Sequence, residues 1–178
     1  NSFSSRKVFR AKIHKLKEHP GQRISAKNVY KLLMGSNIVK SHSRCGKIQD
    51  PYSFRCIPHV HGACRDSFTN AASIINNEIN SVSDNPLIMD QNTVMNSGHF
   101  HGEHIAQAMD ILSIAFSEIG AISERRTHYF MKGIGPGIPP FVTKEPGIES
   151  GYMIAHVTST ALVSENKTLA HPASVDSL

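Results

Sequence analysis

Three histidines and one carboxylate stand within six residues of each other in the segment HFHGEH, residues 99–104. Imidazole and carboxylate groups bind metals and transfer protons. Zinc proteases place two histidines four residues apart on one helix, with a glutamate between them. Here Gly102 interrupts the segment, and its histidines cannot share one helical face. An extended segment would align only His99 and His101, so the spacing predicts no metal site.

A second segment, QDPYSFRC (residues 49–56), has the chemistry to bind an anion. If Pro51 opens a helix, Tyr52 and Arg55 are three residues apart and point the same way. A guanidinium binds a carboxylate through two hydrogen bonds, and a neighbouring tyrosine hydroxyl can move a proton. By spacing alone, however, a packed tyrosine and a surface ion pair are the commoner outcome.

The composition indicates a globular chain of 178 residues, with 39% hydrophobic and 19% charged residues. Its net charge is +5, but many of the basic residues gather between Arg6 and Lys17 and the chain has no tryptophan. We therefore expect a solvated basic surface and not a nucleic-acid partner. No uninterrupted apolar run approaches the roughly 18 residues of a membrane span, so no membrane partner is expected.

The cysteines and the first residues indicate the compartment. Three cysteines occur without the regular spacing of a disulfide framework, and the segment NSFSSRKVFRAKIHK has no apolar leader region. Free thiols are typical of a reducing environment. We expect a cytoplasmic protein.

The helices that must position these residues can be read from the apolar spacing. A turn is expected at His19-Pro20-Gly21, a short helical turn after Asp50, and an interruption at Pro58. Helices are predicted over 25–34, 58–80, 103–126 and 150–170, loops over 36–48 and 131–149, and a small hairpin over 87–95. The last helix is apolar on most of its circumference, which is typical of a helix buried in a bundle or at a subunit interface. The predicted fold is mostly α.

Several longer segments resemble the aromatic amino-acid ammonia-lyases and, within that family, the histidine ammonia-lyases. They are QDPYSFRC, HGAC, NEINSVSDNPLI, SGHFHGE, IAQAMD, ISERR and SGYMIAHVTSTALVSENKTLAHPASVDS, in the family's order from about residue 15 onward. The resemblance implies a segment of a long helical bundle, and a homotetramer with active sites shared between subunits. It also implies that residues 1–178 are a single partial domain, the central part of a lyase.

The activity implied by this resemblance is removal of ammonia from L-histidine to give urocanate. The family's electrophile is a methylidene-imidazolone, which the protein makes from an internal Ala-Ser-Gly; no such tripeptide occurs in this sequence. The group is thus expected from outside this chain, with no separately bound cofactor. Two alternatives stay open: a tyrosine or phenylalanine lyase or aminomutase, and a non-catalytic helical oligomerisation module.

The resemblance also suggests roles for individual residues. Tyr52 is expected close to the reacting carbon as a catalytic residue, and Arg55 on the substrate carboxylate. Gln49 and Phe100 are expected in the same pocket, supported by His99, His101 and Glu103. His99 and His104 depart from the family pattern, which usually has Asn and Pro there, so His99 could alter the pocket beside Phe100.

Overall fold

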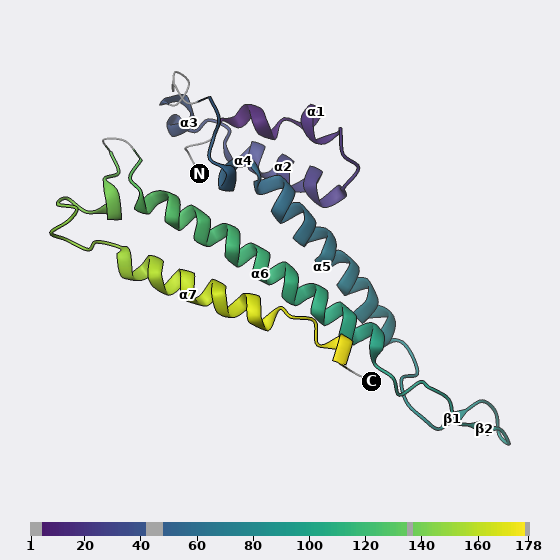
Figure 1. Cartoon of the computed structure of the whole chain (residues 1–178). Coiled ribbons are helices and arrows are strands. Elements are labelled where there is room, and N and C mark those ends of the chain that lie inside the picture. Colours follow the sequence, from purple (N-terminus) through teal and green to yellow (C-terminus); the bar gives the residue numbers. More distant parts are fainter. Residues whose placement is uncertain (1–4, 42–47, 135–136, 177–178) are drawn as a thin grey trace.

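The computed structural model describes residues 5–41, 48–134 and 137–176. Three long helices run antiparallel, with α6 between α5 and α7 (Figure 1). Their bounds are α5 Ile57–Ile79, α6 Glu103–Met131 and α7 Met153–Leu169. A group of shorter helices at the N-terminal side lies against α5. The mostly helical fold expected from the sequence is confirmed.

The N-terminal group differs from the sequence prediction in two places. Its elements are η1 Arg6–Phe9, α1 Ala11–His14, α2 Pro20–Leu32 and α3 Asn37–Ser41. The predicted start of a helix at Ser25 is wrong, because Pro20 occupies the first helical turn, where its fixed φ and missing N–H are tolerated. Part of the predicted loop over 36–48 is the helix α3, and residues 42–47 lie outside the described part of the chain.

Two glycines allow α2 to cross α5 at very short range. A Cβ atom built on Gly62 would lie 2.4 Å from the Cα of Gln22, and one built on Gly21 would lie 2.2 Å from the carbonyl oxygen of Gly62. Asp66 of α5 accepts a hydrogen bond from the Gly21 amide at 2.7 Å. The crossing explains why a glycine is present in the first turn of α2, although glycine weakens helices.

A single residue, Cys56, separates α4 (Tyr52–Arg55) from α5. Pro51 is extended, with φ −54° and ψ 142°, and precedes the single turn of α4. A second helix then starts at Ile57, with Pro58 in its first turn. The predicted short turn followed by a restart is confirmed, and it places Tyr52 and Arg55 on one turn of helix.

The segments that join the long helices also follow the prediction closely. Strand β1 (Leu87–Ile88) pairs antiparallel with β2 (Val94–Met95), which forms the expected hairpin beyond the far end of α5. Between α6 and α7 the described residues, which leave out 135–136, form the short η3 helix, Pro140–Val142, and an isolated bridge between Pro146 and Glu149. The predicted helix over 103–126 continues to Met131, and the one over 150–170 is shorter at its start.

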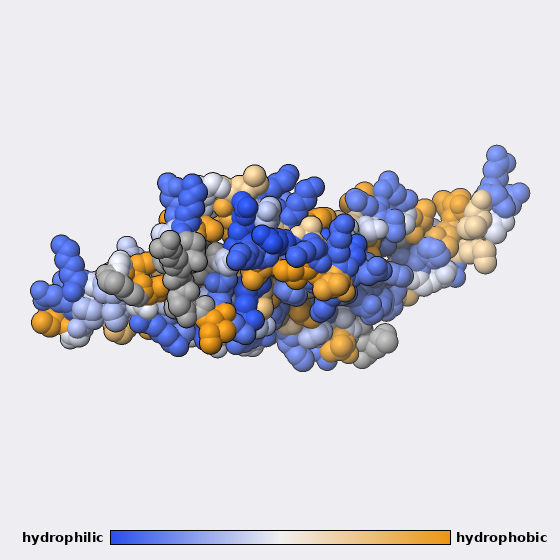
Figure 2. All heavy atoms as spheres, turned by 90° about the horizontal axis from the view of Figure 1, so that it is seen from above, coloured by the Kyte–Doolittle hydropathy of each residue, from blue (hydrophilic) through white to orange (hydrophobic). Residues whose placement is uncertain are grey.

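The core is small and lies along the contacts of α5 with α2 and with α6. Its best buried apolar side chains include Phe9, Ala26, Phe54, Ala108 and Ile122. In contrast, among the described residues α7 has no buried member, and apolar side chains are exposed along the elongated molecule (Figure 2). The predicted burial of this helix is therefore not achieved within the chain.

Helix α6 is long and apolar enough to cross a membrane when judged by length and composition alone. It packs against α5 on one side and α7 on the other, yet only 22% of its most apolar 18-residue window is buried. Its sequence also carries Glu124 and Arg126, both engaged in hydrogen bonds with other elements. These contacts indicate a bundle helix with a face left for further packing.

Candidate active site

Arg55 ends the single turn of α4. Its Nε nitrogen is buried, and within the described residues it has no hydrogen-bond partner. A buried donor without a partner costs roughly 1–3 kcal/mol, more when the group is charged. A bound carboxylate would remove this cost, because it accepts two parallel hydrogen bonds from a guanidinium. This environment fits the anion site predicted from the sequence.

The turn that carries Arg55 is held in place by Arg126 of α6. Arg126 Nε donates to the Ser53 carbonyl oxygen at 3.1 Å, and its Nη2 lies 3.1 Å from Nε2 of His61. Burial lowers the pKa of Arg126. Burial, followed by the charges of Arg126 and Arg65, lowers the pKa of His61, so its neutral ring can accept the hydrogen bond.

An aromatic contact between α4 and α6 supports the same turn. Phe54 is buried, and its ring meets that of Tyr129 edge-on with centroids 5.9 Å apart. Such pairs contribute about 0.5–1.5 kcal/mol beyond the area they bury. The backbone of α4 is thus fixed to α6 by a buried ring and a charged hydrogen bond, which gives Arg55 a rigid base.

Tyr52 and Gln49 lie at the same end of the molecule but face solvent. Tyr52 is 69% exposed, and Gln49 is exposed just before Asp50. The Asp50 carboxylate accepts a hydrogen bond from the Ser5 amide at 2.8 Å, which ties this segment to the start of the described chain. Gln49, Tyr52 and Arg55 thus lie on one short segment, with Gln49 and Tyr52 exposed and the Nε nitrogen of Arg55 buried.

Phe100 lies at the opposite end of the helical hairpin, where α6 begins (Figure 1). It is 65% exposed, and His99 and His101 beside it are exposed as well. Glu103 is the first residue of α6 and accepts a hydrogen bond from Gln107 at 2.8 Å. A helix of 23 residues such as α5 is about 34 Å long, so one chain cannot bring Phe100 and Arg55 into one pocket.

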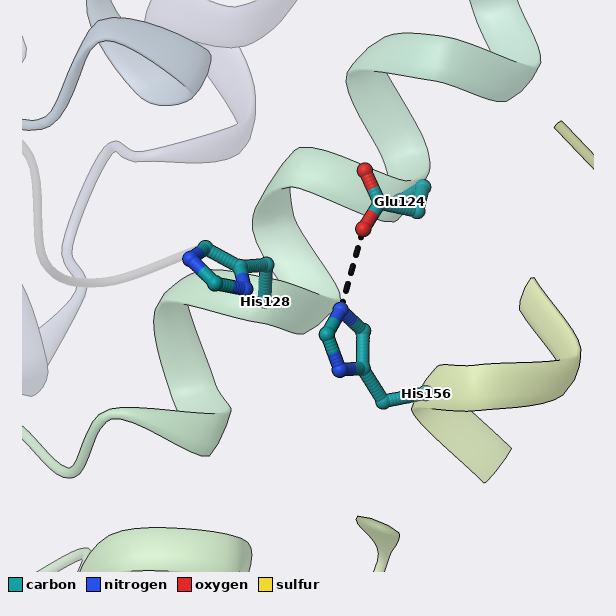
Figure 3. A group of neighbouring side chains, drawn as sticks. All are labelled: Glu124, His128 and His156. Carbon is teal, nitrogen blue, oxygen red and sulfur yellow. Dashed lines mark hydrogen bonds and ion pairs between the residues drawn. The ribbon is translucent and has the colours of Figure 1, made fainter. Parts of the chain in front are cut away.

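A polar cluster that the sequence analysis did not identify joins α6 to α7 (Figure 3). Glu124 is only 2% exposed. Its Oε1 lies 3.0 Å from Nε2 of His156 and accepts from Thr160 at 3.2 Å, and its Oε2 pairs with Arg125. The segment ISERR, which contains Glu124 and Arg126, was the available signal, but it specified no contacts.

The cluster keeps Glu124 ionised despite its burial. Burial raises the pKa of Glu124, but hydrogen bonds from Arg125, His156 and Thr160, together with the charge of Arg125, outweigh it and lower the pKa below its usual value. His128, one helical turn further along α6, has a lowered pKa because of burial and the positive charges of Lys132, Arg125 and His156.

The long antiparallel helices define a mostly helical bundle protein, and Arg55 at one end of it has a buried guanidinium nitrogen without a partner among the described residues. The chain belongs to the aromatic amino acid lyase family, whose model matches residues 3–178. The resemblance inferred from the sequence motifs is thereby confirmed.

Individual relatives agree with this assignment. A protein of Burkholderia cenocepacia named histidine ammonia-lyase is 54% identical over 173 residues, covering 97% of this chain and 34% of the relative. The crystal structure of histidine ammonia-lyase from Trypanosoma cruzi matches with a TM-score of 0.80 at 38% identity, covering 98% of this chain and 32% of that one.

A tyrosine aminomutase from Streptomyces globisporus matches with a TM-score of 0.84 at 32% identity, covering 99% of this chain and 37% of that one. The chain thus spans about a third of the length of the relatives it matches.

Proposed function

We propose that the assembled protein eliminates ammonia from L-histidine to give urocanate, with Arg55 binding the substrate carboxylate. The observation that carries this proposal is the buried Nε of Arg55, which has no partner among the described residues. The 54% identity to the Burkholderia cenocepacia histidine ammonia-lyase favours histidine as the substrate.

The remaining site residues take roles that fit their positions. Tyr52, three residues before Arg55 on the same turn, presents a hydroxyl that can hold or move a proton beside a substrate bound to Arg55. Gln49 contributes an amide at the edge of the same surface. Phe100, supported by His99, His101 and Glu103, supplies an apolar wall from another subunit.

The family's protein-derived methylidene-imidazolone would supply the electrophile that makes the amino group a good leaving group. The tripeptide that forms it is not in this sequence. The residues present fit a pocket beside such a group, since Arg55 has a buried donor to offer and Tyr52 is open to a partner. Their task is to orient the substrate and to move its proton.

We further propose a homotetramer with shared active sites. Two observations support it: Arg55 and Phe100 lie about one helix length apart within the chain, and α7 exposes apolar residues such as Ile154, Val157 and Leu162. Exposed apolar surface of this extent marks an interface with another chain.

We also propose a cytoplasmic location. Cys56 and Cys64 are free thiols, which supports it; Cys45 lies outside the described residues.

The experiment is to add L-histidine to the purified, assembled protein and follow urocanate by its ultraviolet absorbance. A steady rise is the expected result. If only L-tyrosine or L-phenylalanine gives an unsaturated acid, the protein is the alternative lyase and not a histidine ammonia-lyase. If a β-amino acid forms instead, the protein is an aminomutase. No turnover of any of these amino acids by a correctly assembled oligomer would leave a non-catalytic helical module.

The tyrosine aminomutase reaction is the second candidate because that structure superposes slightly better than the histidine enzyme, with a TM-score of 0.84 against 0.80. Sequence identity points the other way, with 38% for the histidine enzyme against 32%. Since backbone similarity in a shared fold says little about the substrate, the identity favours histidine.

A further inference from the structure

We propose that Glu124, His128 and His156 form a binding site for a divalent transition-metal ion such as Zn²⁺ at the contact between α6 and α7. The three side chains each offer one ligand atom, and these atoms all lie within 4.8 Å of one another. The site contains neither Arg55 nor Tyr52, and the proposal does not depend on the proposed lyase activity.

The arrangement of the backbone favours convergence of the three groups. Glu124 and His128 are four residues apart on α6 and therefore share one face of that helix. His156 reaches the same face from α7, with its Nε2 directed at the Glu124 carboxylate (Figure 3). Two helices that pack against each other thus supply all three groups without any flexible loop.

The ligand set suits zinc and chemically similar ions. Two imidazole nitrogens and one carboxylate oxygen are a known zinc set, in which a water molecule completes the coordination. Bonds of about 2.0–2.2 Å around a tetrahedral ion would place ligand atoms roughly 3.3–3.6 Å apart. The Glu124 and His156 atoms are already 3.0 Å apart. His128 must approach, and as a partly exposed side chain it can do so by rotation about its own bonds.

His128 is the residue that a purely structural role of the cluster leaves unexplained. Glu124 is satisfied by Arg125, His156 and Thr160, and His156 is satisfied by Glu124. Within the described ranges His128 makes no side-chain hydrogen bond, although its ring lies 5.2 Å from that of His156. A bound metal ion would give a nitrogen of this ring a partner.

The positive charge of Arg125 near the site weakens binding of a cation but does not block the ligand atoms. Arg125 occupies Oε2 of Glu124 and leaves Oε1 for the ion, so it acts as an outer partner that orients the carboxylate. Its side chain is 58% exposed, so solvent screens its charge. To bind the ion through Nε2, His156 must carry its ring hydrogen on Nδ1. The Thr160 hydroxyl can then donate to the carbonyl oxygen of His156.

The test is a titration of the complete, assembled protein with Zn²⁺ after treatment with a chelator and its removal. We expect saturable binding of one ion per chain by calorimetry, in addition to any site outside this sequence. His128→Ala and His156→Gln should each weaken that site by at least about tenfold, as loss of a ligand or its supporting partner typically does. Co²⁺ in place of Zn²⁺ should give visible absorption bands of a four- or five-coordinate ion, and these bands should be lost in both variants.

His19→Ala is the matched control, because His19 is an exposed histidine at the start of α2. It should bind Zn²⁺ as the wild-type protein does. Circular dichroism of each variant shows whether its helices are retained. Absence of a saturable site in the wild-type protein would overturn the proposal, as would equal affinity in correctly folded His128→Ala and His156→Gln variants.

Discussion

Arg126 and Ser53 are 73 residues apart in the sequence, yet Arg126 Nε donates a hydrogen bond to the Ser53 carbonyl oxygen at 3.1 Å. This contact connects the middle helix of the bundle to the turn that carries Tyr52 and Arg55. The geometry of the candidate site therefore depends on a residue that does not belong to it.

Replacing Arg126 by methionine should loosen this turn. We expect Arg126→Met to lower the free energy of unfolding by about 1–3 kcal/mol, because the Ser53 carbonyl and His61 lose their partner in a partly buried place. Urea denaturation measures the change. Arg65→Met, which removes an exposed arginine of α5, is the control; a comparable loss in both variants would contradict a specific role of the Arg126 contact.

Arg55 should control the binding of the substrate. In the complete enzyme, Arg55→Ala should raise KM for the amino acid by about 10- to 100-fold, since hydrogen bonds to charged groups contribute roughly 1.5–3 kcal/mol. Arg55→Lys should recover only part of this, because an ammonium cannot form the paired hydrogen bonds. Steady-state kinetics with Arg65→Ala as the control measure both effects, and an unchanged KM and kcat in Arg55→Ala would exclude the role.

The separation of Arg55 from Phe100 can be tested with hybrid oligomers. At a substrate concentration near the wild-type KM, Arg55→Ala and Phe100→Ala proteins should each have only a small fraction of the wild-type activity. If each site takes Arg55 from one chain and Phe100 from another, equal co-expression should restore up to about a quarter of the wild-type activity, by random assembly of a symmetric oligomer. Confirmed hybrids with no recovered activity would show that both residues act from the same chain or that one of them is outside the site.

The crossing of α2 and α5 should not tolerate a methyl group. Gly62→Ala places a Cβ 2.4 Å from backbone atoms of Gln22, so the helices must separate. Overpacking of this kind costs typically about 1–3 kcal/mol. Gly98→Ala, where no atom lies within 4 Å of the added Cβ, should be nearly neutral. Thermal or urea denaturation compares the two, and equal stability would contradict the close crossing.

Glu124 should make stability depend on pH in the acid range. Its pKa is lower in the folded protein than its ordinary value near 4.5. Its contribution is therefore present above that ordinary value and is lost as the pH falls through the lower folded pKa. Glu124→Gln should be less stable than the wild-type protein at pH 7, and the difference should shrink on acidification. A difference that is constant with pH would show that the carboxylate charge plays no part.

Local patterns in the sequence predicted most of the elements correctly. Proline geometry, turn residues and apolar spacing predict three of them: the new helix with Pro58 in its first turn, the hairpin over 87–95 and the long helix from Glu103. The start of α2 was misplaced because Pro20 and Gly21 were interpreted as a turn. The signal that would have corrected this, the close approach of Gly62, lies 41 positions away and appears only when the helices cross.

The sequence by itself determined the helical class, the pairing of Tyr52 with Arg55 on one turn, and, through its motifs, the family. These depend on neighbouring residues and on spacings of three or four positions, which helical geometry fixes locally. Only the tertiary structure decided that Arg126 holds this turn, that Phe100 lies about a helix length away from it, and that His156 meets Glu124 and His128. Such contacts join residues distant in the sequence, and the packing of whole helices sets them, so no local pattern contains them.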